Sequence, residues 1–227
     1  MYNIVDSSVL QRVFMMAVRD DCTGTCFIIE KDKRYLVTAK HLFEKANYPK
    51  QTKVYIMQGN KWVSIDNKVY YHTSDTIDIA VIETNYFDNI DFEPVYYTYK
   101  ESLFSQDVFM LGFPYGNESG FYEANRNFPI PYIKKGILSG KRGETLIIDW
   151  DNNHGFSGGP VVYRKYENGD FSERMYIAGV TSGYLQHEIE VVANDAVGKI
   201  IGSANENSGM GVMYPIEYAI EIIESIK

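Results

Sequence analysis

A serine surrounded by glycines gives this chain its clearest chemical signal. Ser157 lies in the run Gly155-Phe156-Ser157-Gly158-Gly159-Pro160. Glycine reaches backbone conformations that other residues avoid, and it lets a ligand approach the main chain. In such a turn the serine hydroxyl is exposed, and the N–H groups of Gly155 and Ser157 can point outward together to hold an oxyanion. The alternative is an ordinary glycine-rich turn between two strands, and the rest of the chain decides between them.

A histidine and an aspartate complete a candidate catalytic set. A serine hydroxyl needs a base that removes its proton. Of four histidines, His41 follows the apolar, β-branched run 35–39, which predicts a strand that places the ring at its end. The base in turn needs a buried carboxylate to fix its tautomer. Asp78 opens an apolar run typical of a buried strand, whereas its rival Asp75 has the polar neighbours of a turn.

Three motifs in this order resemble those of the trypsin-like (chymotrypsin-fold) serine proteases, closest to the HtrA/Deg type: Thr38-Ala39-Lys40-His41, Asp78-Ile79-Ala80-Val81 and Gly155-Phe156-Ser157-Gly158-Gly159-Pro160. Residues 24–29, 111–114 and 136–140 support the resemblance, which covers most of the chain. It implies an all-β fold of two six-stranded antiparallel β-barrels with a C-terminal α-helix. HtrA-type relatives usually continue into PDZ modules, and we expect none here.

The resemblance also implies one trypsin-like protease domain over residues 1–227. We expect an N-terminal barrel over about 10–95, a C-terminal barrel over about 106–214 and a helix over 215–227. His41 and Asp78 would come from the first barrel and Ser157 from the second, so that the active site lies between them.

The roles follow from the same resemblance. Ser157 is expected to be the nucleophile, His41 the general base and then acid, and Asp78 the orienting carboxylate. The N–H groups of Gly155 and Ser157 are expected to form the oxyanion hole. The implied activity is that of a serine endopeptidase, which hydrolyses peptide bonds of protein substrates through an acyl-enzyme.

The substrate-binding residues are expected around this set. Ser182 corresponds to the family's serine that hydrogen-bonds the catalytic acid, and Gly183 and Tyr184 continue a strand that would pair with the substrate backbone. His154 would lie on the wall of the specificity pocket. Asp151 would lie at its base and select lysine or arginine if it is buried; alternatively, Asp151 lies in a solvated turn.

One departure from the digestive members of the family concerns activation. Those relatives have an aspartate before the nucleophile, which pairs with a new N-terminal amine after zymogen cleavage. Here the residue is Phe156. A phenyl ring cannot form that ion pair, so we expect no activation by removal of a propeptide.

Composition and charge argue against several classes of protein. The 227 residues are 45% hydrophobic, which is ample for a globular core. The net charge of −8 argues against nucleic-acid binding. The longest apolar stretch, residues 13–18, is too short for a signal peptide or a membrane span. A cytoplasmic protein without membrane contact is therefore expected.

The cysteines predict no special chemistry. Cys22 and Cys26 are the only two. They are too distant for a disulfide on an extended segment, and in the expected compartment both should be reduced. With scattered histidines they support no zinc site. We expect neither a metal nor another cofactor.

Short apolar and alternating runs predict the strands. They fall at residues 12–18, 24–30, 34–39, 53–57, 61–65, 68–72, 78–83, 107–111, 132–139, 145–149, 159–163, 175–181 and 209–214.

Helices are predicted over 8–16, over 188–201 with an interruption at Gly198, and over the C-terminus. Asn168-Gly169 predicts a hairpin turn, and residues 96–102 are expected to form the crossover between barrels.

Two other functions compete with the endopeptidase. A catalytically inactive trypsin-like fold could serve as a protein-binding module, although such copies tend to lose a catalytic group. An esterase could use the same triad, but the chain order His, Asp, Ser differs from the Ser, acid, His order of α/β-hydrolases. A cytosolic protease also needs restraint, which favours a regulatory protein partner or a homo-oligomer.

Overall fold

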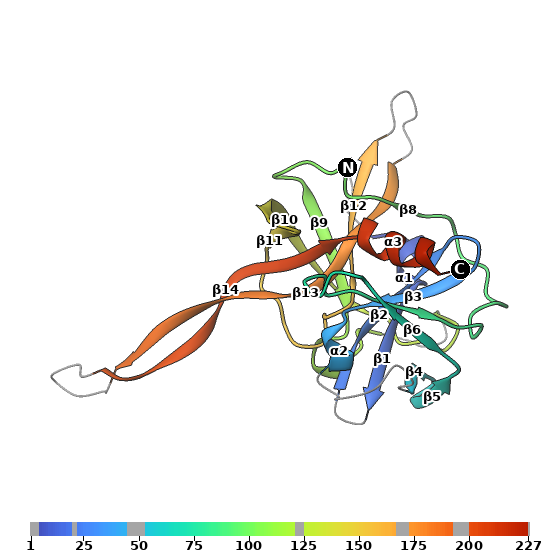
Figure 1. Ribbon diagram of the computed structural model, residues 1–227, viewed down its shortest axis with the longest axis horizontal. Helices are drawn as coiled ribbons and strands as arrows, with labels where there is room; N and C mark the ends of the chain where they lie inside the picture. The colour runs from blue at the N-terminus through green and yellow to red at the C-terminus, as the bar shows by residue number, and fades with distance from the viewer. Residues whose placement is uncertain are drawn as a thin grey trace.

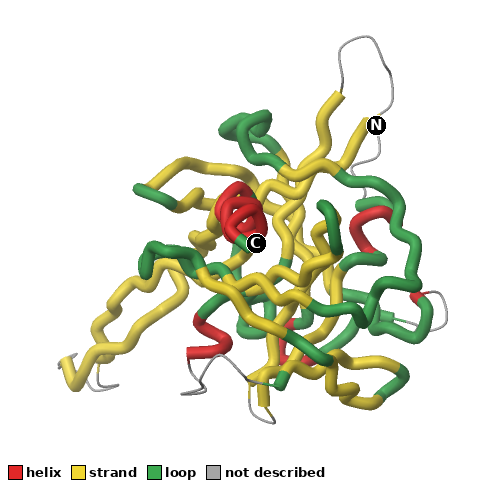
Figure 2. The backbone as a smooth tube through the Cα atoms, turned by 45° about the vertical axis from the view of Figure 1, so that its right-hand side comes forward, coloured by secondary structure: helices red, strands yellow, loops and turns green. Residues whose placement is uncertain are grey.

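The computed structural model describes residues 5–19, 22–44, 53–120, 125–166, 173–192 and 200–226. Within these ranges the chain forms two barrel-like β-sheets and a C-terminal helix (Figure 1). Figure 2 shows that strands dominate the chain and that the helices are short. The predicted all-β architecture with a C-terminal helix is confirmed.

The first sheet contains seven antiparallel strands in the order β5-β4-β1-β2-β3-β7-β6. Their ends lie within two residues of the predicted runs: β1 (Val13–Arg19), β2 (Cys22–Glu30), β3 (Arg34–Thr38), β4 (Val54–Gln58), β5 (Lys61–Ile65), β6 (Lys68–Tyr71) and β7 (Ala80–Glu83). Gly59 and Asn60 both have positive φ, which suits the tight turn between β4 and β5.

The second sheet closes on itself. Six strands form a ring because β12 pairs with both β9 and β13: β9 (Asp107–Gly112), β10 (Tyr132–Arg142), β11 (Thr145–Asp149), β12 (Pro160–Tyr166), β13 (Glu173–Val192) and β14 (Ile200–Pro215). A seventh strand, β8 (Tyr96–Tyr97), runs parallel to β13.

Each sheet therefore has one strand more than the six-stranded barrel that the resemblance implies. In the second sheet the extra strand comes from the segment expected to be a plain crossover. Its Tyr96 ring stacks on Tyr176 of β13 at 5.0 Å between centroids. This aromatic contact helps to hold the crossover against the sheet edge.

The predicted helix over residues 188–201 is wrong. The described residues on both sides of 193–199 belong to a long antiparallel hairpin, in which Ile189 pairs with Ala204 and Val192 with Ile200. Glu188-Ile189-Glu190-Val191 alternates with period two, and valine and isoleucine favour strands. Figure 1 shows this hairpin, formed by β13 and β14, extending away from the rest of the molecule.

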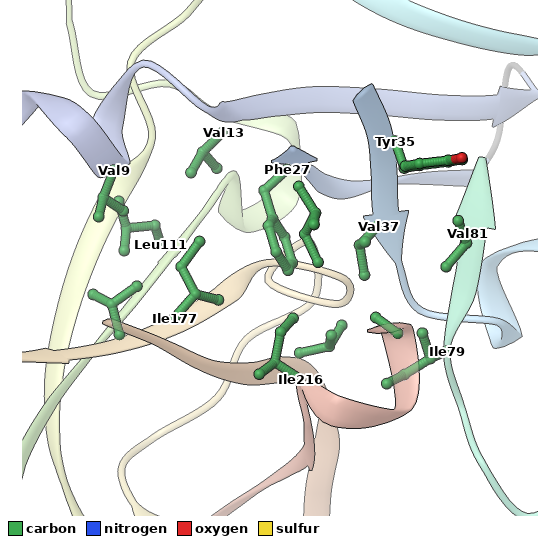
Figure 3. Packing of buried hydrophobic residues seen from close by; sticks show 14 of the residues in the cluster. Val9, Val13, Phe27, Tyr35, Val37, Ile79, Val81, Leu111, Ile177 and Ile216 are labelled. Atoms are coloured by element: carbon green, nitrogen blue, oxygen red, sulfur yellow. The ribbon is translucent and has the colours of Figure 1, made fainter. Parts of the chain in front are cut away.

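A shared hydrophobic core joins the two sheets. Alternate residues of β2 and β3, such as Phe27 and Val37, pack against Leu111 and Ile177 of the second sheet (Figure 3). The residues between them, such as Ile28 and Leu36, face a separate core inside the first sheet. Because both faces of these strands are buried, they read as continuous apolar runs in the sequence.

The helices are short. α1 (Ser7–Leu10) ends well before the predicted residue 16, because the apolar residues from Val13 onward belong to β1. The C-terminal helix α3 (Glu217–Ser225) buries Ala219, Ile222 and Ile223 against the shared core. In the part of the chain that the structure describes, no helix has the length and apolar character needed to cross a membrane.

The single described cysteine side chain belongs to the core. Cys26 is a fully buried free thiol among the apolar side chains of the first sheet, and burial raises its pKa. The side chain of Cys22 and the predicted turn at residues 168–169 lie outside the described residues.

Candidate active site

The ends of two paired strands bring His41 and Asp78 together. β3 and β7 are antiparallel, and their ladder ends where Thr38 pairs with Ala80. His41 opens α2 (His41–Glu44) just beyond β3, and Asp78 lies just before β7. The Asp78 carboxylate accepts hydrogen bonds from the backbone N–H of His41 at Oδ1 and from His41 Nδ1 at Oδ2, both of 2.7 Å. A carboxylate only accepts, so Nδ1 carries the proton and Nε2 is left as a base.

The alternative acid lies elsewhere. The Asp75 side chain is fully exposed and has Lys40 Nζ at 3.8 Å from Oδ1. Asp78, by contrast, is largely buried beside the imidazole. The carboxylate that hydrogen-bonds the His41 ring is therefore that of Asp78 and not that of Asp75.

Ser182 provides a third donor to Asp78. The β13–β14 register shifts between Thr181 and Gly183, so Ser182 lies at a bulge. A bulge re-aims the side chain that it carries. Here the Ser182 hydroxyl donates to Asp78 Oδ2, which is the hydrogen bond that the resemblance implies.

The electrostatics of this cluster favour an ionised acid. Burial alone would raise the pKa of Asp78. The hydrogen bonds from His41 and Ser182 outweigh burial, and together they lower the pKa below the ordinary aspartate value. Asp78 is therefore negative at neutral pH and can stabilise a protonated His41.

The turn that carries Ser157 requires its glycines. Gly155 has φ of 100° and Gly158 has φ of 83°, a region that side-chain-bearing residues rarely adopt. A Cβ on Gly155 would overlap the carbonyl oxygen of Phe113, and a Cβ on Gly158 would overlap that of Thr25. The glycines thus let the turn lie directly on the backbone of both sheets.

Thr25, a fully buried residue of β2, fastens this turn. Its hydroxyl donates to the carbonyl of Gly155 at 2.7 Å and accepts from the N–H of Phe113 at 3.2 Å. Its own N–H donates to the carbonyl of Ser157 at 2.9 Å. This role was not predicted, although Thr25 is a polar residue inside the apolar run 24–29.

Two carbonyl contacts orient the candidate oxyanion hole. The carbonyl of His154 accepts from the N–H of Tyr115 at 2.8 Å, and that of Phe156 accepts from the N–H of Gly159 at 2.9 Å. In a planar trans peptide the next N–H points the opposite way. The N–H groups of Gly155 and Ser157 therefore point away from these contacts, and among the described residues neither has an acceptor.

The hydroxyl of Ser157 is bonded to Ser182 and not to His41. Ser157 Oγ donates to the carbonyl of Ser182 at 3.2 Å. Within the described ranges, no hydrogen bond joins Ser157 to the His41 ring. Ser182 thus contacts Ser157 through its carbonyl and Asp78 through its hydroxyl.

The candidate specificity residue Asp151 is not a buried pocket carboxylate. It is exposed, and its Oδ1 accepts from Asn207 Nδ2 at 2.9 Å. The buried neighbour is Asn152, whose Nδ2 donates to the carbonyl of Gly183 at 2.8 Å. Of the two alternatives for Asp151, its exposure fits the solvated position and not the desolvated charge that would select lysine or arginine.

The other predicted substrate-binding residues are partly or fully exposed. Gly183 and Tyr184 are half-buried and follow Ser182 on β13. His154 is exposed, with its ring 6.4 Å from that of Tyr115.

Phe156 points into the core of the second sheet. It is fully buried and makes an edge contact with Trp150 at 5.4 Å between ring centroids. Lys134 Nζ lies 5.7 Å from the centre of the Phe156 ring. The residue before Ser157 is thus part of the hydrophobic core of the second sheet.

The remaining histidines take no part in the cluster. His72 Nε2 contacts Glu221 Oε2 at 3.1 Å on α3, and His187 is exposed on the long hairpin. In the described part of the chain, no group of three or more His, Cys, Asp or Glu side chains is placed to hold a metal ion.

Two β-sheets with this cluster between them define a trypsin-like peptidase fold. Residues 24–167 match the Trypsin-like peptidase domain. The chain belongs to this family. No curated protein matches it.

Solved structures share the fold at low sequence identity. The active form of the Rv3671c protease from M. tuberculosis has a TM-score of 0.56 and 17% identity, covering 97% of this chain and 82% of that chain. The HtrA-type protease AlgW, in a structure with a tripeptide, has a TM-score of 0.58 and 16% identity, covering 97% and 61%. A serine endoprotease from Yersinia pestis has a TM-score of 0.59 and 17% identity, covering 98% and 67%. At this identity the likeness shows the fold alone.

Proposed function

We propose that the protein is a serine endopeptidase that hydrolyses protein substrates through Ser157, His41 and Asp78. The observation that carries this proposal is the His41–Asp78 pair, held at 2.7 Å with Nε2 left as a base. The outward N–H groups of Gly155 and Ser157 support it. Membership of a peptidase family agrees with protein substrates.

The chemistry follows from this arrangement. When substrate binds, Ser157 Oγ releases the Ser182 carbonyl and gives its proton to His41 Nε2 as it attacks the peptide carbonyl carbon. The N–H groups of Gly155 and Ser157 hold the resulting oxyanion, while Asp78 stabilises the imidazolium. His41 then protonates the leaving amine, which breaks the peptide bond and leaves an acyl-enzyme. A water molecule then attacks the carbonyl carbon of the acyl-enzyme and gives its proton to His41. His41 returns this proton to Ser157 Oγ as the ester bond breaks, and the carboxylic acid product leaves.

The competing function is an inactive fold that binds protein segments. One observation favours it: Ser157 Oγ donates to Ser182 and not to His41. Against this reading, catalytic hydrogen bonds are often long or absent before substrate binds. A rotation of the Ser157 side chain alone frees the hydroxyl from its bond to Ser182.

A fluorophosphonate probe separates the two functions. It forms a covalent bond only with an activated serine, so we expect stoichiometric labelling of the wild type. We expect no labelling of Ser157→Ala and severely slowed labelling of His41→Ala. Hydrolysis of casein alongside an aryl ester then distinguishes an endopeptidase from an esterase. A wild type that remains unlabelled and leaves casein intact would support the binding module.

A further inference from the structure

The long hairpin is an unusual surface for a compact domain. Among the described residues, 186–192 of β13 and 200–207 of β14 pair only with each other, and together we call them the arm. The arm extends away from the rest of the molecule (Figure 1). Its exposed side chains include Ile189, Val192 and Ile201, the last 64% exposed. A two-stranded ribbon is marginally stable in water, and an apolar strand edge pairs readily with another chain.

The arm is continuous with the candidate active site. β13 continues from Ser182, which contacts both Ser157 and Asp78, into the arm, with one further register shift between Tyr184 and Gln186. The base of the arm is also tied to the turn before the nucleophile. Asn207 Nδ2 donates to the carbonyl of Asn152 at 2.8 Å. Whatever pairs with the arm is thereby held in a defined position relative to Ser157.

Beyond Thr181, no described strand pairs with the edge of β13 that faces away from β14. β12 pairs with β13 only as far as Val180, and the serine turn bonds the backbone of Thr181. Among the described residues, β14 is the only strand that pairs with β13 from Gly183 to Val192. At about 3.3 Å per residue, the seven arm residues of β13 lengthen this edge by roughly 20 Å.

The charge of the arm selects between partners. The arm contains three acidic residues, Glu188, Glu190 and Glu206, and neither lysine nor arginine. Pairing of two arms would bring acidic side chains together, which is destabilising. A basic segment with apolar residues matches both the charge and the exposed Ile and Val side chains.

We propose that the arm binds the substrate chain on the N-terminal side of the scissile bond and selects basic and apolar residues there. This inference rests on the proposed endopeptidase function. A substrate antiparallel to β13, with its scissile bond at Ser157, places its N-terminal part along the arm. Counting one substrate residue per strand residue, the arm contacts roughly the fourth to tenth positions before the scissile bond.

The test measures binding to Ser157→Ala protein by fluorescence anisotropy. Two labelled peptides share the residues around the scissile bond and differ only upstream, where one alternates lysine with valine and the other glutamate with valine. We expect the basic peptide to bind about tenfold more tightly at low salt, and the difference to shrink at high salt. In Glu188→Gln/Glu190→Gln protein the preference should fall about threefold or more.

A shortened arm is the second variant. Gln186 and Asn207 face each other in the ladder, so an Asn-Gly turn can join them while the bonds of Asn207 are kept. This variant should bind both peptides equally and weakly. Equal binding by the full-length arm would overturn the inference. So would a concentration-dependent dimer in sedimentation that disappears in the shortened protein, because the arm would then bind a second copy.

Fluorophosphonate labelling of the wild type keeps the two proposals separate. If Ser157 is labelled and the basic peptide shows no preference, only the inference about the arm fails. If Ser157 is not labelled, the endopeptidase proposal fails, and with it the assignment of the arm to substrate. Peptide binding then shows whether the arm still selects basic segments as a binding module.

Discussion

Three donors converge on the carboxylate of Asp78: the N–H and the Nδ1 of His41, and the hydroxyl of Ser182. A buried carboxylate is costly unless such bonds satisfy it. Here they do so while leaving Nε2 of His41 as a base. Asp75, which is exposed, has no comparable set of donors among the described residues.

Substitutions in this cluster test the catalytic roles. Ser157→Ala and His41→Ala should each lower peptide hydrolysis by several orders of magnitude, and the double variant should be little worse, since the residues act as one unit. Asp78→Asn should lower kcat by on the order of 10⁴, because the imidazole is then held in the wrong tautomer. Asp75→Asn is the matched control. Near-normal kcat in Asp78→Asn would remove Asp78 from the mechanism.

The lowered pKa of Asp78 predicts a pH dependence of stability. A group whose pKa is lower in the folded state adds stability that is present above its unfolded value, about 3.9, and is lost as the pH falls through the folded value. The free energy of unfolding of Ser157→Ala protein should therefore drop below about pH 4. Urea titrations between pH 6 and pH 3 measure this drop. Adding Asp78→Asn should make the drop smaller, and Asp75→Asn is the matched control for the loss of an exposed carboxylate.

At the scale of elements, the serine turn is held by strands from both sheets. Thr25 of β2 bonds the carbonyls of Gly155 and Ser157, and the N–H of Gly158 donates to Thr181 of β13 at 2.7 Å. These contacts fix the peptide planes that aim the candidate oxyanion donors. The turn's geometry is therefore a property of the contact between the sheets, as well as of its own glycines.

Thr25→Val tests this fastening. Valine keeps the shape of threonine but leaves the carbonyl of Gly155 and the N–H of Phe113 without their buried partner, which should cost about 1–3 kcal/mol of unfolding free energy. The kcat should fall more than KM changes, because the oxyanion donors lose their support. Thr25→Ser keeps the hydroxyl and is the control. Equal kinetics in both variants would show that the hydroxyl does not orient the turn.

The whole molecule depends on the core shared by the two sheets. Val37 and Val81 of the first sheet and Ile177 of the second lie in one cluster (Figure 3). Ile222 of α3 belongs to the same cluster. Neither sheet can bury this surface alone. We therefore expect the two sheets to unfold together.

The two tryptophans make this cooperativity measurable. Trp62 lies on β5 of the first sheet and is 40% exposed, whereas Trp150 is buried in the core of the second. In Trp62→Phe/Ser157→Ala protein, fluorescence reports the second sheet and far-ultraviolet circular dichroism reports both. The urea curves should coincide. Adding Ile177→Ala should lower the stability by about 2–5 kcal/mol and shift both curves equally; separate midpoints would show that the sheets are independent.

Local patterns in the sequence were sufficient for most of the strands. Continuous or alternating apolar runs predicted every strand of the first sheet within two residues, because burial on one or both faces selects apolar residues directly. The motifs around His41, Asp78 and Ser157 identified the candidate site residues for a similar reason. Each of these side chains needs a particular local structure, such as a strand end or a glycine-rich turn, and the neighbouring residues have the types that form it.

Tertiary structure decided what depends on distant partners. Asp151 could be a pocket carboxylate or a turn residue until Asn207, more than fifty positions later, fixed it at the surface. The prediction of a helix over 188–201 was wrong because residues with a period-two pattern form a strand when a partner is present, and here that partner is β14. The hydroxyl of Thr25 bonds Gly155 and Phe113, which lie 130 and 88 residues further along the chain, so neighbouring residues could not identify its partners. The local sequence predicts which residues are buried and which backbone conformation they prefer. The hydrogen-bond partners of a side chain depend on how the two sheets pack together, which the local sequence does not show.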